Sequence, residues 1–207
     1  MAFMDGAANL LAIETTTETC SVALASGGHW FEDTRFAPRL HNRHLLGMID
    51  GLLNAAAVDR RALRMIAFGA GPGSFTGVRI GAAVAQGIAL GTGAGVVRVA
   101  SSAVAAESLR RSTPRRGSVS LSRTSRPGWS YVARYELHDD AAFCLEFDEL
   151  VPNGDVDTGA IEATRCVMRA RIVGEIAFAN LGSAGEPATA VPFYVEGDSP
   201  WRPTTLD

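Results

Sequence analysis

The sequence contains no lysine, and all 19 of its basic residues are arginine. This absence excludes a phosphate-loop lysine, a Schiff-base lysine and a Ser-Lys catalytic dyad. Arginine still allows bidentate recognition of phosphate or carboxylate groups. The net charge of −3 at pH 7 indicates no general affinity for nucleic acid.

Cysteine and long apolar runs are also scarce. The three cysteines are odd in number and widely spaced, which fits neither a disulfide framework nor a zinc ribbon, so we expect thiols buried in the core. The longest apolar stretch, residues 78–97, includes Arg79 and Gln86 and is rich in glycine and alanine, which argues against a membrane span. The first residues have an acid before a short apolar run and no basic start, unlike a signal peptide. We therefore expect a cytoplasmic protein without a membrane partner.

Hydrophobic periodicity predicts alternating strands and helices over the first 111 residues. Period-two or continuous apolar runs predict strands at 9–15, 19–26, 29–36, 65–70 and 95–100. Helical spacing predicts helices at 40–57, from about 76 to 91, and from Ser101, as N-cap, to 111. The resulting order, β-β-β-α-β-α-β-α, indicates an α/β fold with a mixed sheet covered by helices.

The second half of the chain is smaller and less regular. It suggests strands at 118–122, 130–138, 142–147 and 190–195, a helix at 171–181, an irregular stretch at 150–164 and a loose tail at 198–207. Residues 110–126 contain six arginines and five serines without an acid, which is typical of a solvated loop and could also follow RNA phosphates. We expect two domains, residues 1–111 and 112–207.

A glycine-rich stretch, residues 69–91, has the composition of a phosphate-binding loop, but its residue spacing matches no known glycine-rich motif considered below. A phosphate loop needs Lys-Ser/Thr after its last glycine, whereas Val-Arg follows Gly77. The spacing of Gly71, Gly73 and Gly77 differs by one residue from the glycine spacing of the dinucleotide fingerprint. A nucleophile elbow requires glycine two residues before its serine, but Pro72 stands two residues before Ser74. We interpret the stretch as a structural turn from a strand into a helix.

This structural turn ends at a helix start whose amides need a cap, and Ser74 or Thr76 is suited to provide it. Such a helix end could alternatively hold an anion. The residues assigned to the turn are Gly71, Pro72, Gly73, Ser74, Thr76 and Gly77.

The helix after the turn carries two stripes of small residues, one of them Gly77, Gly81, Ala85 and Ala89. Glycine inside a helix costs about 1 kcal/mol relative to alanine. Another backbone must therefore pack closely, either the chain's own sheet or a partner's helix, and the sequence leaves both open.

Two further sets of residues could bind metal but more often do not. His41 and His44 lie three residues apart at a helix start without an evident third ligand, so we expect solvent-facing or capping histidines and no metal site. Glu14 and Glu18 could hold Mg²⁺ through water, although acids at a hairpin are usually on the surface.

Three segments of the sequence closely resemble the TsaB (YeaZ) family. They are LAIETTTETCSVAL, the helix beginning HNRHLLGMID, and GPGSFTGVRIGAAVAQGIALG. The resemblance runs from about residue 10 to 109 and returns at 131–136 and 191–194. It implies an actin/Hsp70/sugar-kinase-like (ribonuclease H-like) first domain with an abbreviated second α/β domain.

The resemblance implies a non-catalytic scaffold in the synthesis of threonylcarbamoyladenosine next to the tRNA anticodon. The family docks on a catalytic TsaD subunit, which a TsaE ATPase joins, so tRNA is reached indirectly. ATP and Mg²⁺ are used by these partners, and no cofactor is bound tightly here. The docking helices, 41–56 and 76–90, also form the family's homodimer. The residues carried over to this partner interface are Leu45, Met48, Ile49, Leu52, Arg79, Ala82, Ala85, Gln86 and Ala89.

Glu14 stands where nucleotide-binding relatives usually have an aspartate, so Glu14 and Thr15 are at most a weak nucleotide or Mg²⁺ site. Because the second half also lacks a glycine-rich adenosine loop, we expect weak or absent ATP binding. The alternatives are a stand-alone ATPase or kinase, a glycopeptidase-like enzyme, and direct tRNA binding through residues 110–126.

The chain departs from the family around residues 124–131, where TSRPGWSY keeps only the arginine, glycine and tyrosine of the usual motif. Arginine, serine and proline enrichment is typical of a GC-rich gene read out of frame. We hypothesise a local frameshift or sequence error within residues 110–130, which resequencing the gene would decide. The region after Glu149 is also shorter than is usual in the family.

Overall fold

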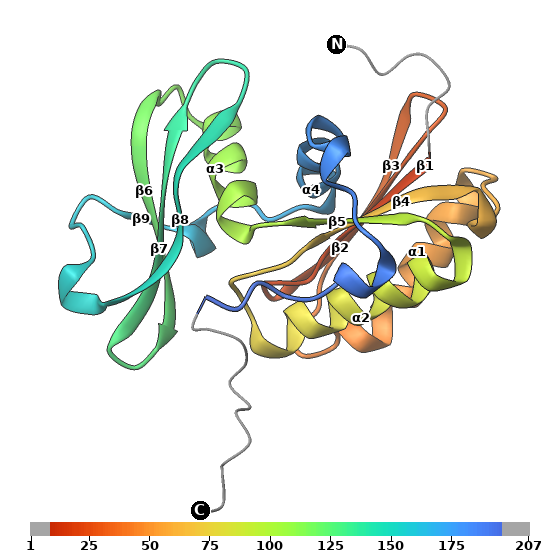
Figure 1. Cartoon of the computed structure of the whole chain (residues 1–207), viewed down its shortest axis with the longest axis horizontal. Helices are drawn as coiled ribbons and strands as arrows, with labels where there is room; N and C mark the ends of the chain where they lie inside the picture. The colour runs from red at the N-terminus through yellow and green to blue at the C-terminus, as the bar shows by residue number, and fades with distance from the viewer. Residues whose placement is uncertain (1–8, 196–207) are drawn as a thin grey trace, which may run out of the picture.

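The computed structural model describes residues 9–195, apart from the side chain of Leu181. Two sheets lie side by side and share one elongated molecule (Figure 1). The expectations for the first residues and for the tail at 198–207 lie outside the described residues.

The first sheet has five strands in the order β3-β2-β1-β4-β5. β1 pairs antiparallel with β2, which pairs antiparallel with β3, while β1, β4 and β5 run parallel. The predicted β-β-β-α-β-α-β-α order is confirmed. The strands are β1 (Asn9–Glu14), β2 (Thr19–Ser26), β3 (His29–Phe36), β4 (Leu63–Gly69) and β5 (Gly95–Val99).

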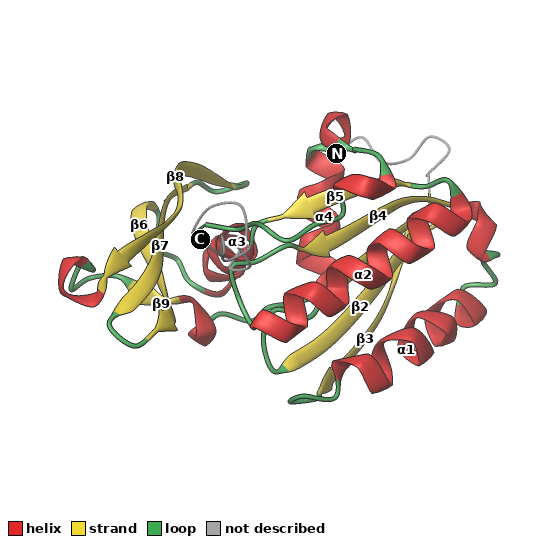
Figure 2. Ribbon diagram, turned by 60° about the horizontal axis from the view of Figure 1, so that its bottom comes forward, coloured by secondary structure: helices red, strands yellow, loops and turns green. Residues whose placement is uncertain are grey.

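Helices cover both faces of this sheet, which explains why β1 is a continuous apolar run. Leu11 and Ile13 pack toward α1 (His41–Ala55) and α2 (Phe75–Thr92). Leu10 and Ala12 point the other way, into the core formed with α4 (Ala170–Ala179). Figure 2 shows α1 and α2 lying together across one face of the sheet.

The second sheet has four strands in the order β8-β7-β6-β9 and packs one face against α3 (Ser101–Ser112). Its edge strand is poorly covered, because the rings of Phe143 and Phe147 on β8 are 52% and 83% exposed. The strands predicted at 130–138 and 142–147 are confirmed; they pair antiparallel, and the second extends to Pro152. The strands are β6 (Gly117–Arg126), β7 (Trp129–Leu137), β8 (Ala142–Pro152) and β9 (Ile161–Glu162).

One core joins the two sheets. Val97 and Val99 of β5, Val104 of α3 and Leu121 of β6 belong to the same buried cluster as α4. The helix α4 follows the second sheet in sequence but packs on the first. The division at residues 111 and 112 therefore stays a prediction.

Several local expectations are wrong. Residues 190–195 form no strand; they cross the first sheet as an irregular segment in which the Phe193 amide donates to the Ala70 carbonyl at 2.8 Å. The N-cap of α3 is Ala100 rather than Ser101, whose buried hydroxyl has no partner among the described residues. The stretch 150–164, expected as a loop, contains the end of β8 and all of β9.

Candidate functional site

A cleft of about 1510 Å³ opens where β1 and β4 end. In sheets with parallel strands, ligands bind beside the carboxyl ends of the strands. The walls come from six parts of the chain, together with Tyr131: residues 16–19 after β1, 34–42 from β3 to the start of α1, 71–80 at the start of α2, 123–126 at the end of β6, 164–169, and 192–195. Both sheets therefore contribute to it.

The glycine-rich turn forms one wall of the cleft and is held by the loop after β1. The Ser74 amide donates to the Thr16 carbonyl at 2.8 Å, and the Thr15 hydroxyl donates to the Gly77 carbonyl at 2.9 Å. Ser74 is the N-cap, because its hydroxyl accepts from the Gly77 amide at 3.2 Å; Thr76 lies inside the first turn of α2. The loop after β1 thus holds this turn from one side, while Ser74, Phe75 and Thr76 are exposed at the cleft.

The first small-residue stripe of α2 is explained by close packing inside the chain. A Cβ atom at Gly77 would overlap the Thr15 carbonyl, and one at Gly81 would lie 2.6 Å from the Thr15 hydroxyl. Ala85 and Ala89 on the same stripe are fully buried. The helix can therefore approach β1 only with small residues on this side.

Glu14, at the end of β1, is completely buried rather than on the surface as expected. Its Oε1 accepts from the Thr16 amide and the Thr16 hydroxyl, both at 2.6 Å. Burial raises the pKa of this carboxyl, although the hydrogen bonds from Thr16 and the charge of Arg123 act against the shift. Glu14 is thus enclosed, whereas Glu18 is exposed at the cleft wall.

Arg123 of β6 links the second sheet to the end of β1. Its side chain is buried, and Nη1 donates to the Thr16 carbonyl at 3.3 Å. Its Nη2 has no hydrogen-bond partner among the described residues. Burial lowers the pKa of this guanidinium, while the nearby carboxylates of Glu14, Glu162 and Asp148 oppose the shift.

Comparisons with known proteins agree with this architecture. A family model described as TsaD, tRNA N6-adenosine threonylcarbamoyltransferase, matches residues 34–141, more than half of the chain. The "tRNA threonylcarbamoyladenosine biosynthesis protein TsaB" of Haemophilus influenzae is 44% identical over 90 residues, which are 44% of this chain and 38% of that protein. The protein of the same name from Escherichia coli is 45% identical over 82 residues, 40% and 36% of the two chains.

The chain belongs to the TsaB (YeaZ) family, within the wider TsaD-like group. The structure described as YeaZ from Pseudomonas aeruginosa superposes with a TM-score of 0.79 at 28% identity, covering 90% of this chain and 99% of that one. The curated relatives are matched over less than two fifths of their own length. The actin-like, ribonuclease H-like fold expected from the sequence is confirmed.

The side chains carried over as the TsaB partner interface mostly lie inside this chain. Those from α1 and the alanines of α2 are at most 7% exposed and pack on the sheet: Leu45, Met48, Ile49, Leu52, Ala82, Ala85 and Ala89. The Gln86 side-chain amide donates to the Pro187 carbonyl, and the Arg79 guanidinium stacks 3.6 Å from the Phe75 ring. A partner on these helices would therefore meet different residues.

The outward side of α1 and α2 is open and largely uncharged. Leu46 and Leu90 are 56% and 68% exposed, and Ala83 also lies at the surface. Four glycines on this side have no atom within 4 Å of the position a Cβ would take: Gly47, Gly51, Gly87 and Gly91. We call these seven residues the outer helix face.

His41 and His44 differ in their surroundings. His41 is buried and its Nε2 has no hydrogen-bond partner among the described residues, which corrects the expectation of a solvent-facing or capping side chain. His44 is half-buried. Within residues 9–195, no group of three or more potential ligands lies close enough to hold a metal ion.

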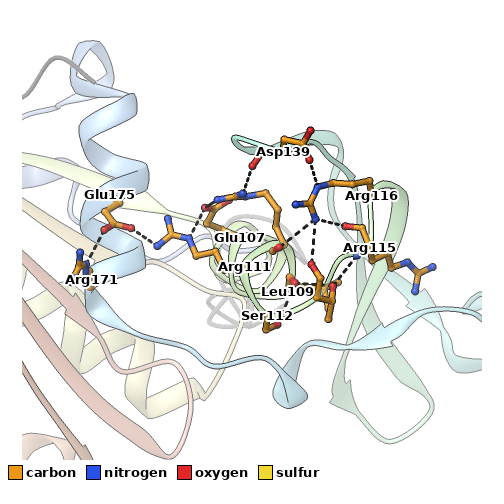
Figure 3. Close-up of polar contacts among 11 residues, drawn as sticks. Glu107, Leu109, Arg111, Ser112, Arg115, Arg116, Asp139, Arg171 and Glu175 are labelled. Carbon is orange, nitrogen blue, oxygen red and sulfur yellow. Dashed lines mark hydrogen bonds and ion pairs between the residues drawn. The ribbon is translucent and has the colours of Figure 1, made fainter.

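The arginine-serine stretch is ordered, contrary to the expected loop. It forms the end of α3 and all of β6. Arg110 and Arg111 both bind Glu107, and Arg116 binds Asp139 at 2.8 Å (Figure 3). These arginines neutralise the chain's own acids, so this stretch by itself is not a continuous phosphate-binding track.

No helix among the described residues is long and apolar enough to cross a membrane.

Sequence reasoning missed the cleft arginines Arg39, Arg165 and Arg169. Arg39 lies just before α1, whereas Arg165 and Arg169 lie between β9 and α4, so no local pattern connects the two segments.

Proposed function

We propose that this chain is a non-catalytic subunit in the synthesis of threonylcarbamoyladenosine in tRNA, and that it docks on a TsaD-like transferase subunit through the outer helix face. Support comes from the TsaB name of the curated relatives and from the matching family model. A TsaE-like ATPase completes the assembly, and ATP and Mg²⁺ act in the partner subunits.

The observation that carries this proposal is the set of open glycines on the outer helix face. Each glycine inside a helix costs about 1 kcal/mol relative to alanine. Gly77 and Gly81 are required by contact with Thr15, but no atom of the described chain requires Gly47 or Gly87. Small residues at regular helical spacing let two helix backbones approach closely. The outer face is therefore suited to receive helices of a second protein.

The apolar residues beside these glycines fit a protein partner. Leu46 and Leu90 would bury most of their exposed surface under an opposing helix, a gain of up to about 2 kcal/mol each. A second copy of this chain fits the same face, so homodimer formation and docking on the transferase subunit compete.

The geometry at the end of β1 favours the role of a non-catalytic subunit over that of an enzyme. The loop of Thr15 and Thr16 packs against the start of α2, and the Glu14 carboxylate is enclosed by its own chain. We infer that neither holds a nucleotide phosphate or its Mg²⁺. Calorimetry on the isolated chain tests the rival reading of a stand-alone ATPase or kinase, because micromolar ATP affinity would contradict our proposal. Release of peptides from a glycopeptide would likewise support the glycopeptidase reading.

Docking is tested by substituting Gly87 with arginine and measuring co-purification with the TsaD-like subunit of the same cell. Gly154→Arg is the matched control, because Gly154 is equally open but lies in the second half of the chain. We expect Gly87→Arg to lose both the partner and tRNA threonylcarbamoylation in the reconstituted system, while Gly154→Arg keeps both. Retention of both by every variant of the outer helix face would refute the proposal.

A further inference from the structure

The cleft concentrates positive charge in a chain that is negative overall. Six arginines line it, against a single lining carboxylate, that of Glu18. The net charge of the whole chain is −3. Such a concentration in one concave surface attracts anions selectively. The lining arginines are Arg39, Arg79, Arg123, Arg126, Arg165 and Arg169.

Several of these arginines are available to an external anion. Arg39, Arg165 and Arg169 are exposed, and no acidic side chain of residues 9–195 forms an ion pair with them. Arg110 and Arg111, outside the cleft, are paired with Glu107. Arg39, Arg165 and Arg169 therefore keep their charge, whereas Arg110 and Arg111 are neutralised by an acid of the chain.

Buried groups at the base of the cleft add to this field. Arg123 brings a guanidinium into the wall, and its Nη2 has no hydrogen-bond partner among the described residues. The carboxyl nearest to the end of β1, Glu14, has its pKa raised by burial, which weakens its negative charge. The carboxylates of Glu14, Glu162 and Asp148 lie near the Arg123 guanidinium, so the exposed arginines supply most of the positive charge of the cleft.

Exposed aromatic rings lie between the arginines. Phe36, Phe75 and Tyr194 line the cleft and are 75%, 60% and 41% exposed, and Phe193 is 36% exposed. The Arg79 guanidinium lies 3.6 Å from the Phe75 ring centre and 5.6 Å from that of Tyr194. Rings left in water beside cations are surfaces on which bases can stack.

We propose that this cleft binds a single-stranded RNA segment directly, with its phosphates on the arginines and its bases on the rings. Single-strand-binding proteins combine a basic groove with aromatic platforms in this way. Unstacked bases occur in RNA loops, whereas bases in a duplex are already stacked. An acidic peptide would use the arginines but leave the rings without flat partners. That the segment is a tRNA loop rests on the function proposed above.

The charge contribution is tested with the full chain and a fluorescently labelled 12-nucleotide RNA of mixed sequence, by anisotropy at several salt concentrations. The variant R165Q/R169Q removes two cleft charges. The control R61Q/R115Q removes two exposed charges outside the cleft. We expect the cleft variant to lose affinity at least about tenfold and the salt slope to fall by roughly 1.4, or 0.7 per contact. The control should change affinity less than about twofold.

The stacking contribution is tested by F75A/Y194A, with F147A on the exposed edge strand β8 as control. Loss of a stacked base weakens binding by roughly tenfold. We expect F75A/Y194A to lose this affinity for the single-stranded RNA while the salt dependence of binding stays unchanged. F147A should leave the affinity unchanged. Circular dichroism checks that every variant stays folded.

Three results would overturn the proposal: equal affinity for the single strand and a duplex of the same length, equally effective competition by polyglutamate, or equal losses in cleft and control variants. The docking variant Gly87→Arg separates this proposal from the previous one. Gly87→Arg should bind RNA as the wild type does. Loss of docking with RNA binding intact would therefore concern only the docking proposal, and loss of RNA binding with docking intact would concern only the cleft.

Discussion

The outer helix face and the cleft meet at α2 but differ in every physical respect. The outer helix face is built from glycine, alanine and leucine on two helices. The cleft is built from arginine and aromatic side chains on segments up to about 150 residues apart. The first fits the backbone of another protein, and the second fits a flexible anion with flat groups. Under the two proposals above, one small chain joins a protein partner and an RNA through separate surfaces.

The inward and outward sides of α2 provide the largest contrast. Gly77→Ala places a Cβ against the Thr15 carbonyl, which neither backbone can avoid, so we expect a loss of about 3 kcal/mol in the free energy of unfolding. Gly87→Ala adds a Cβ to open space and should stabilise the helix by about 1 kcal/mol. Urea unfolding of both variants measures these values. Shifts of the same sign would contradict the packing described for α2.

The two surfaces should also separate functionally. Gly87→Arg should weaken binding of the transferase subunit by at least about 30-fold, or 2 kcal/mol, and leave RNA binding unchanged. R165Q/R169Q should show the opposite pattern. Titrations of both variants with both ligands give four affinities. If one substitution weakened both ligands equally, the outer helix face and the cleft would not be independent.

Asp148, in a small pocket with Ser102 and Arg123, gives a pH-dependent effect on stability. Burial raises the pKa of Asp148 to about 6, while the Ser102 hydroxyl at 2.5 Å and the charge of Arg123 act in the opposite direction. Since the folded chain holds this proton more tightly than the unfolded chain, stability falls as the pH rises from about 4 to 6. Asp148→Asn should therefore raise the free energy of unfolding at pH 8 by about 2 kcal/mol.

The control for this prediction is the same substitution measured at low pH. At pH 4, Asp148 is protonated in the folded state, and Asp148→Asn should have little effect on urea unfolding. An equal effect at pH 4 and pH 8 would show that the carboxylate charge is not the cause.

The smallest expected effect lies at Glu107, which connects α3 to α4 far from both surfaces. Burial disfavours its charge, but the guanidinium groups of Arg110 and Arg111 outweigh that and lower its pKa. Arg111 also binds Glu175 of α4 (Figure 3). Because Arg111 is 40% exposed, we expect Glu107→Gln to cost only about 1 kcal/mol above pH 5.

This cost should shrink as the pH falls through the lowered pKa of Glu107, because the wild-type carboxylate then takes up a proton. Thermal unfolding at pH 7 and pH 3 measures it. Glu107→Gln should leave both ligand affinities unchanged, which makes it a control for the two surfaces.

Local sequence patterns predicted the order of elements and the turn before α2. Periodicity located α1 and α2, and Ser74 and the glycines predicted the abrupt helix start. Most of the interface residues carried over from the family resemblance lie on the apolar sides of these helices. The apolar side of an amphipathic helix usually faces its own core, so Leu45 and Ile49 are buried and unavailable to a partner.

Long-range features were beyond local patterns. Glu14 is buried because Gly69 and Thr16 enclose it, and the sequence does not say which neighbours cover a strand end. Arg39 and Arg169 meet at one cleft only because the topology brings the two segments together. A site formed by segments far apart in the sequence can be recognised only once the fold is known.

The most direct test of the central claim is a sedimentation titration of the TsaD-like subunit with the wild type, Gly87→Arg and Gly154→Arg. Docking through the outer helix face predicts a complex with the wild type and with Gly154→Arg, and at least about 30-fold weaker association with Gly87→Arg. If Gly87→Arg associated as tightly as the wild type, the docking surface would lie elsewhere and the account given for these glycines would be wrong.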